Sequence, residues 1–187
     1  ACLEQMREEV GPDLLDDRAM MILRLVHNRR MGRASAWRAY IRLLPGEEIV
    51  RALPMHWDDD VLQERLGGTA LVEQVREQKL QLRRLHERVL RDGLCARWPE
   101  LFPPSDFSWA ALCWGHAIFW SRAICVPLGG GHEECLTPLL DLCNHAPGAT
   151  HELRYVSGGG GSCAMVRQET ALALTGGGGG EEGSNFV

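Results

Sequence analysis

Two stretches say most about the fold of this chain: Ser121-Arg122-Ala123, and Leu136-Thr137-Pro138-Leu139-Leu140-Asp141-Leu142-Cys143-Asn144-His145. In the second stretch an apolar run, which we expect to be a strand, ends in a turn that bears an acid, an amide and an imidazole. Polar groups gathered behind a buried strand need hydrogen-bond partners or a functional role. The pattern alone leaves both interpretations open, because Asp and Asn side chains in turns also bond to nearby backbone groups.

The chain before these stretches predicts helices. Apolar residues recur at spacings of three and four from Leu15 to Val26, with acids before them and bases after them, as suits a helix dipole. Start and stop residues predict four further helices, from Ser35 to Leu44, from Asp58 to Leu66, from Thr69 to Gly93 and from Ser105 to Trp120.

After Ser121 the pattern changes to short apolar runs separated by glycine. The runs at 123–128, 136–142, 153–156 and 163–166 predict strands, and the glycine runs at 129–131, 158–161 and 176–180 predict loops. The sequence therefore predicts an α+β protein with a mostly helical region over 1–120, a strand-bearing region over 121–175 and a disordered, glycine-rich tail over 176–187.

The quoted stretches resemble the SET domain of the Rubisco large-subunit lysine methyltransferase-like group, in which an S-R-A-F segment precedes L-V-P-L-x-D-x-x-N-H. Upstream segments agree with that group in order. Ser35, Trp37, Tyr40, Leu44 and Pro45 resemble its S-x-W-x-x-Y-x-x-x-L-P stretch. The remaining matches are Trp57 with Leu66-Gly67-Gly68-Thr69, which resemble W…L-x-G-T, and Phe107-Ser108-Trp109-Ala110, which resembles F-x-W-A.

The resemblance implies a partial SET fold, with a helical insert followed by a cofactor-facing part, that binds S-adenosylmethionine. It implies that Arg122 contacts the carboxylate side of the cofactor and that Asp141 lies at the same pocket. It also implies that Asn144 holds the amino-acid end and that the backbone of His145 meets the adenine edge. Such pairings are chemically sound, because a guanidinium binds a carboxylate and an ammonium needs an oxygen acceptor.

The reaction implied is methyl transfer to a lysine of a protein substrate, with histidine left open as an acceptor. The group's opening glycine segment has no match here, and neither does the tyrosine of its closing G-E-x-x-x-x-x-Y-G motif. Neither Tyr40, in the helical part, nor Tyr155, in an early strand, is assigned a catalytic role. We therefore expect the chain by itself to be inactive. The alternative is a catalytically inactive, SET-derived helical module that binds other proteins.

The composition of the chain limits the kinds of partner and compartment that we expect for it. A formal net charge of −5 does not favour direct nucleic-acid binding, and no stretch reaches the roughly 18 apolar residues of a membrane helix. Seven scattered cysteines indicate a reducing compartment with buried thiols. We expect a monomer, and the sequence leaves the compartment open among chloroplast, cytoplasm and nucleus.

Other constellations are weaker. A zinc hypothesis is suggested by Cys125, His132, Cys135, Cys143, His145 and Cys163, but the cysteines lack the close spacing of structural zinc sites, so we expect no metal. Glycines at 178, 180 and 183 match G-x-G-x-x-G only because they fall in a glycine run with no helix after it. Most of the six tryptophans are expected in the core, and His116 is expected to be a hydrogen-bonded core histidine.

Overall fold

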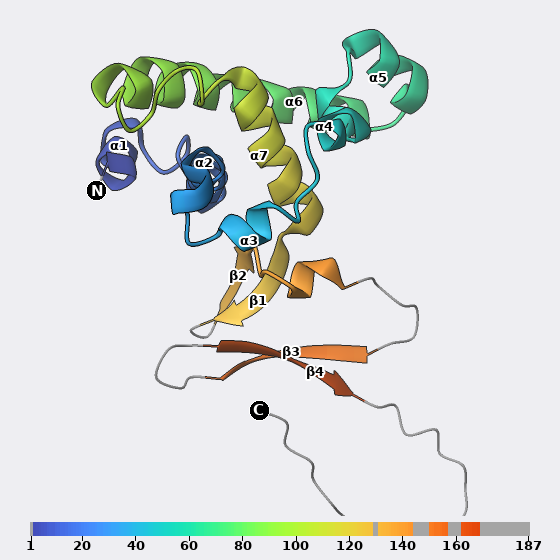
Figure 1. Ribbon diagram of the computed structural model, residues 1–187. Helices are drawn as coiled ribbons and strands as arrows, with labels where there is room; N and C mark the ends of the chain where they lie inside the picture. Colours follow the sequence, from blue (N-terminus) through green and yellow to red (C-terminus); the bar gives the residue numbers. More distant parts are fainter. Residues whose placement is uncertain (1, 129–130, 144–149, 157–161, 169–187) are drawn as a thin grey trace, which may run out of the picture.

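The computed structural model describes residues 2–128, 131–143, 150–156 and 162–168. Helices occupy the chain as far as Arg122, and two antiparallel hairpins follow on one side of them (Figure 1). The predicted α+β class with a mostly helical first part is confirmed. The predictions for Asn144, His145 and the tail 176–187 lie outside the described residues.

The helical part is built from α-helices joined by short 3₁₀ turns. The α-helices are α1 Cys2–Val10, α2 Asp17–Met31, α3 Arg38–Ile41, α4 Glu48–Ala52, α5 Asp59–Leu66, α6 Leu71–Arg84 and α7 Trp109–Arg122. The 3₁₀ turns are η1 Gly32–Ala34 and η2 Pro54–His56, and a π-helix, η3 Leu85–Cys95, continues α6.

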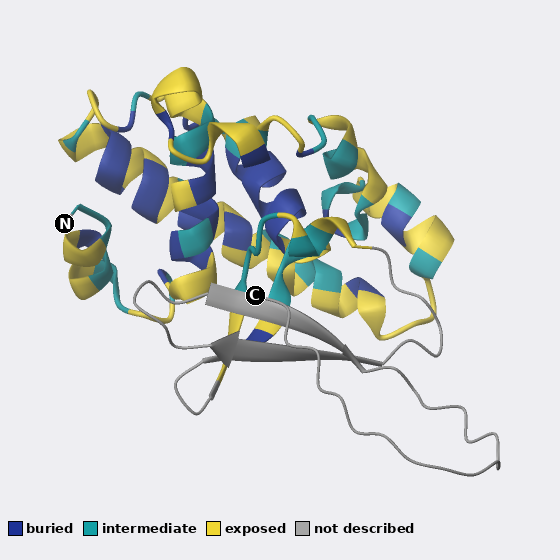
Figure 2. Ribbon diagram, turned by 60° about the horizontal axis from the view of Figure 1, so that its bottom comes forward, coloured by how far each residue is buried: buried dark blue, intermediate teal, exposed yellow. Residues whose placement is uncertain are grey.

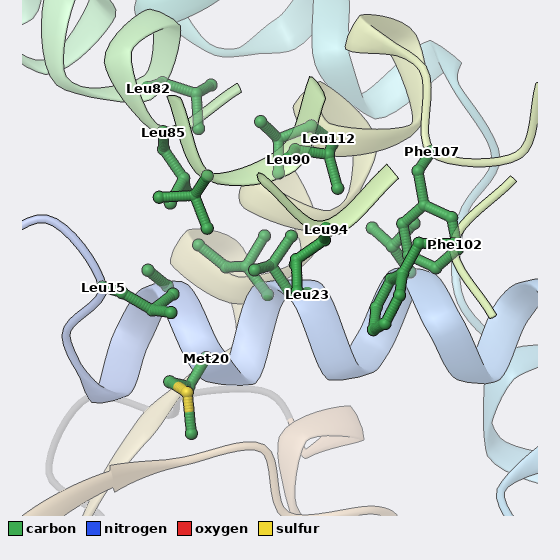
Figure 3. Close-up of a cluster of buried hydrophobic side chains, with 14 of the residues drawn as sticks. Leu15, Met20, Leu23, Leu82, Leu85, Leu90, Leu94, Phe102, Phe107 and Leu112 are labelled. Atoms are coloured by element: carbon green, nitrogen blue, oxygen red, sulfur yellow. The ribbon is translucent and has the colours of Figure 1, made fainter. Parts of the chain in front are cut away.

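The core forms where α2 and α7 pack on the long helix made of α6 and η3. Helix α2 is capped by Asp16, whose side chain accepts a hydrogen bond of 2.7 Å from the backbone N–H of Ala19. The apolar stripe predicted for this helix is buried, and its residues meet leucines of the other helices (Figures 2 and 3). The labelled core residues are Leu15, Met20, Leu23, Leu82, Leu85, Leu90, Leu94, Phe102, Phe107 and Leu112.

Two glycines let helices approach closely. A Cβ atom on Gly93 would lie 2.8 Å from Cε of Met6 in α1, and one on Gly115 would lie 2.8 Å from Cγ2 of Val26 in α2. The prediction that Gly93 ends its helix is wrong, because this glycine is buried inside η3 and makes room for α1. Helix α7 starts at Trp109, after the capping side chain of Ser108, and not at Ser105 as predicted.

The strands are β1 Ile124–Leu128, β2 Gly131–Cys135, β3 Thr150–Val156 and β4 Ser162–Gln168. Strands β1 and β2 form one hairpin, β3 and β4 form the other, and the backbone of β1 runs beside that of β3. The strand β2 was not predicted, since Gly131-His132-Glu133-Glu134-Cys135 has no run of apolar residues. Its backbone pairs with that of β1.

The strand predicted over 136–142 is wrong. The chain turns there and forms a short 3₁₀ helix, η4 Leu140–Leu142, in which the N–H of Asp141 donates to the carbonyl of Thr137 over 3.1 Å. Leu139 adopts a φ of 74°, which reverses the chain direction and cannot occur in a strand. Local backbone hydrogen bonds therefore fold this apolar run into a turn. The hydrophobic periodicity of the sequence gives no sign of these bonds.

The core prediction for the tryptophans is also wrong for most of them. Only Trp114 is buried, and Trp37, Trp109 and Trp120 keep 40% or more of their surface exposed. Guanidinium groups cover some of these rings, as Arg18 does at Trp120. None of the helices in the described ranges is long and apolar enough to cross a bilayer.

Candidate functional site

The candidate site lies where the end of α7 meets the turn that holds η4. Arg122 is the last residue of α7, and Asp141 is the middle residue of η4. One Nη1 atom of Arg122 lies 3.5 Å from both the backbone carbonyl oxygen and the Oδ2 atom of Asp141. The fold thus brings together two of the four residues that the sequence singled out, and Asn144 and His145 lie outside the described residues.

Tyr40 completes this cluster from the helical part of the chain. Its hydroxyl donates a hydrogen bond of 2.6 Å to Oδ2 of Asp141 across a separation of 101 residues. Tyr40 is buried, and the side chain of Asp141 has 0% of its surface exposed, whereas that of Arg122 keeps 20%. The Asp141 carboxyl is therefore held inside the protein between a tyrosine hydroxyl and a guanidinium.

Two polar atoms of the cluster are left without partners. Oδ1 of Asp141 and Oγ1 of Thr137 are buried and have no hydrogen-bond partner in the part of the chain that the structure describes. A buried, unpaired oxygen costs roughly 1–3 kcal/mol, so its presence calls for an additional donor. The Nε and Nη2 atoms of Arg122 likewise have no bond to another described residue.

The helices around Tyr40 fix its position. Tyr40 packs in a second hydrophobic cluster with Leu25, Leu44, Trp114 and Ile118. In this cluster the indole N–H of Trp114 donates to the backbone carbonyl of Pro45 over 2.9 Å. Because this bond joins α7 to the segment that follows α3, the hydroxyl of Tyr40 is held in a fixed relation to the end of α7.

The electrostatics of the cluster keep Tyr40 protonated. Burial raises the pKa of the Tyr40 hydroxyl above its ordinary value, and the hydrogen bond to the Asp141 carboxylate raises that pKa further. The hydroxyl is therefore a hydrogen-bond donor at neutral pH and not a general base. The arrangement can hold a positively charged or N–H-bearing group at Oδ1 of Asp141 and a negatively charged group at Arg122.

A cavity of about 340 Å³ lies beside the cluster. Its wall is formed by α2, α3 and residues 135–138, and Tyr40 is the member of the cluster that it shares. Arg24 and the exposed Trp37 stand at this wall, together with Leu136 and Pro138 from the segment before η4. The turn is open to solvent at Leu139, which is 72% exposed, and at Leu142, whereas the side chain of Asp141 between them is enclosed.

The remaining candidates from the sequence are the residues of the zinc hypothesis and His116. In the described ranges, no three His, Cys, Asp or Glu side chains converge as a metal site would need, and the zinc hypothesis stays untested at His145 and Cys163. His116 is buried as expected, but its Nδ1 atom has no hydrogen-bond partner among the described residues. Burial lowers the pKa of His116 to about 3, with the neighbouring His56 adding to the effect.

Sequence reasoning missed the part that Tyr40 plays here. A signal existed, since a tyrosine placed in a helical core normally needs a partner for its hydroxyl. The partner lies 101 residues further along the chain, so no local pattern could identify it.

Comparison with protein-family models, with curated proteins and with solved structures finds no significant match for this chain.

Proposed function

We propose that this chain is part of a SET-type, S-adenosylmethionine-dependent protein-lysine N-methyltransferase. One observation supports the proposal most strongly. Tyr40, Arg122 and Asp141 come from three separate motif stretches of the resemblance, and they meet in a single buried polar cluster. Motif matches that arose by chance in a different fold would have no reason to converge.

The chemistry of the cluster fits the amino-acid end of the cofactor. Arg122 offers guanidinium donors for a carboxylate, and Oδ1 of Asp141 offers an acceptor for an ammonium. The carboxyl of Asp141 has no exposed surface, so the ammonium reaches Oδ1 only if η4 or Arg122 moves locally. The exposed side chains of η4 and its flank, Leu139 and Leu142, permit such a movement without disrupting the helical core.

The cofactor, when bound, supplies an electrophilic methyl group on a positively charged sulfur. Such a methyl group would be suited to transfer to the lone pair of a neutral lysine amine, with the sulfur as the leaving group. A lysine with an ordinary pKa near ~10.4 must lose its proton first, which a desolvating channel favours. Arg122 and Asp141 would bind and orient the cofactor, and no residue of this chain is assigned the proton transfer.

Binding, rather than turnover, tests the proposal, since no catalytic tyrosine is matched in the chain. Calorimetric titration of the chain with S-adenosylmethionine should show saturable binding. Arg122→Ala should weaken it by about 10- to 100-fold, since a charge-assisted contact contributes roughly 1.5–3 kcal/mol. Asn144→Ala should cost at least about 1–3 kcal/mol for the same reason.

Arg42→Ala is the matched control, because Arg42 is an exposed arginine that directly follows α3, the helix that carries Tyr40. Its affinity should stay within about twofold of the unchanged chain. A correctly folded chain that does not bind S-adenosylmethionine at millimolar concentration would contradict the proposal.

The second candidate is a protein-binding module without catalytic activity. This candidate is favoured by the complete burial of the Asp141 side chain. In that case the only role of the carboxyl would be to hold η4 against the helices. This candidate predicts that Arg122→Ala lowers the free energy of unfolding while no cofactor binds to any variant.

A further inference from the structure

We infer that Tyr40 is a positioning residue of the proposed cofactor pocket, which holds Asp141 so that its Oδ1 atom faces the ammonium of the ligand. The inference rests on the proposed function, because it concerns the same pocket. It assigns a task in ligand binding to a residue of the helical part, in α3, which precedes the first strand, β1 at Ile124, by more than 80 residues.

The two oxygens of the Asp141 carboxylate have different surroundings. Oδ2 accepts the hydroxyl of Tyr40 at 2.6 Å and lies 3.5 Å from Nη1 of Arg122, whereas Oδ1 has no partner among the described residues. The torsion that interchanges the two oxygens is soft and roughly twofold. A strong bond to Oδ2 therefore leaves Oδ1 as the unpaired acceptor that a ligand meets once η4 or Arg122 has moved.

Tyr40 can hold the carboxylate because it cannot move easily itself. Its side chain is 7% exposed and is enclosed by Leu25, Leu44, Trp114 and Ile118. Its carbonyl also accepts the N–H of Leu43 over 2.9 Å, which fixes the backbone of the short helix α3. The ordering of this side chain was completed on folding, so ligand binding does not require it again.

The hydroxyl also keeps Arg122 available. At 3.5 Å the contact between Nη1 and Oδ2 is long for a charge-assisted bond, which is typically about 2.7–2.9 Å. Without Tyr40 the guanidinium could close on both carboxylate oxygens as a bidentate pair. Both the acceptor for an ammonium and the donor for a carboxylate would then be used up within the protein.

The test compares two ligands that differ only at the amino-acid end. S-adenosylhomocysteine carries the carboxylate and the ammonium, whereas 5′-methylthioadenosine carries the same nucleoside and sulfur without them. Tyr40→Phe should weaken S-adenosylhomocysteine about tenfold in calorimetric titration, as expected for one hydrogen bond to a charged group. It should leave 5′-methylthioadenosine within about twofold, which a general loss of structure would not do.

Trp114→Phe is the matched control, because it also removes one hydrogen bond from the same hydrophobic cluster without touching Asp141. It should change both ligands equally or neither. Asp141→Asn should show the same selective loss as Tyr40→Phe, and the double variant should be no weaker than Asp141→Asn alone, since Tyr40 acts through Asp141.

The outcomes separate the two proposals. If the unchanged chain binds neither ligand, the proposed function and this inference both fall. If it binds both ligands and Tyr40→Phe weakens neither, or weakens them equally, the positioning role falls and the proposed function stands. Should Tyr40→Phe not fold, an Asp141→Asn variant that binds both ligands normally would refute the inference by itself.

Discussion

The hydroxyl of Tyr40 and Oδ2 of Asp141 are 2.6 Å apart, and this bond ties helix α3 to the turn that follows β2. The carboxyl is fully enclosed, so removing the hydroxyl leaves a buried charge without its closest donor. We expect Tyr40→Phe to lower the free energy of unfolding by about 1–3 kcal/mol. Urea unfolding followed by circular dichroism measures the change.

Ser121→Ala provides the comparison, because it also removes a hydroxyl that donates one hydrogen bond. The acceptor here is the backbone carbonyl of Ile118, and Ser121 is exposed near the end of α7. This substitution should change the free energy of unfolding by less than about 0.5 kcal/mol. Equal changes in the free energy of unfolding would mean that the enclosed bond of Tyr40 stabilises the protein no more than the exposed bond of Ser121.

The same bond predicts a dependence on alkaline pH. The pKa of Tyr40 is raised in the folded protein, by burial first and by the bond to Asp141 second. Its protonated form is thus favoured by folding, and the stabilisation is complete below the ordinary pKa of 10.0 and declines as the pH rises above it. The stability difference between the unchanged chain and Tyr40→Phe should therefore be constant from pH 7 to 9 and shrink above pH 10. A stability difference that grows above pH 10 would show that folding lowers the pKa of Tyr40 instead of raising it.

How far the fold could be predicted depended on whether the signal was local. Helix α5 was predicted within a residue, because Asp58 and Gly67 mark its ends and a local pattern lies between them. The strand predicted at 136–142 failed because an apolar run fits a strand and a turn equally well. The bond from Asp141 to the carbonyl of Thr137 decided between the two, and no periodicity reports it.

The candidate site followed a similar division. Arg122 and Asp141 were predicted from a resemblance in motif order, and the fold brings them within 3.5 Å. Tyr40 stood within one of those motifs, yet its partner could not be deduced because it depends on how α3 packs against α7. A motif can therefore identify the residues of a site without showing which of them are in contact.

Two glycines give a prediction about helix packing. A Cβ atom on Gly115 would lie 3.3 Å from the backbone carbonyl of Ile22 as well as 2.8 Å from Val26, and that backbone cannot retract. We expect Gly115→Ala to destabilise the protein by about 1–3 kcal/mol, despite the gain of about 1 kcal/mol in helix propensity. Thermal or urea unfolding measures it.

Gly93→Ala should be milder, because the two closest atoms to its new methyl group belong to the flexible end of Met6. The backbone atom near it, the Arg88 carbonyl oxygen at 3.2 Å, belongs to η3 itself, whereas the Ile22 carbonyl near Gly115 belongs to the packed helix α2. The ranking of the two variants is the test. A larger loss at Gly93 than at Gly115 would mean that α1 is held more rigidly against η3 than α2 is against α7.

The enclosed histidine of α7 gives a prediction for acid. In the unfolded chain His116 titrates near its ordinary pKa of 6.5, but burial, with His56 beside it, lowers the pKa in the folded protein to about 3. Between these values the unfolded state binds one more proton than the folded state does. The contribution of His116 to stability is therefore complete above pH 6.5 and falls as the pH is lowered, by up to about 1.4 kcal/mol per pH unit.

His116→Asn should remove this part of the slope, since asparagine keeps a polar side chain that does not titrate. The free energy of unfolding, measured in urea from pH 7 to pH 4.5, should then fall less steeply than in the unchanged chain, by about 1 kcal/mol per pH unit. His132→Asn is the control for replacing a histidine by asparagine, because His132 is exposed on β2 and lies outside the helical core. His56 titrates with the same sign, because burial and the charge of Lys79 lower its pKa, so some slope should remain in His116→Asn. Parallel slopes for His116→Asn and the unchanged chain would mean that water reaches the imidazole of His116 and that α7 opens locally at this turn.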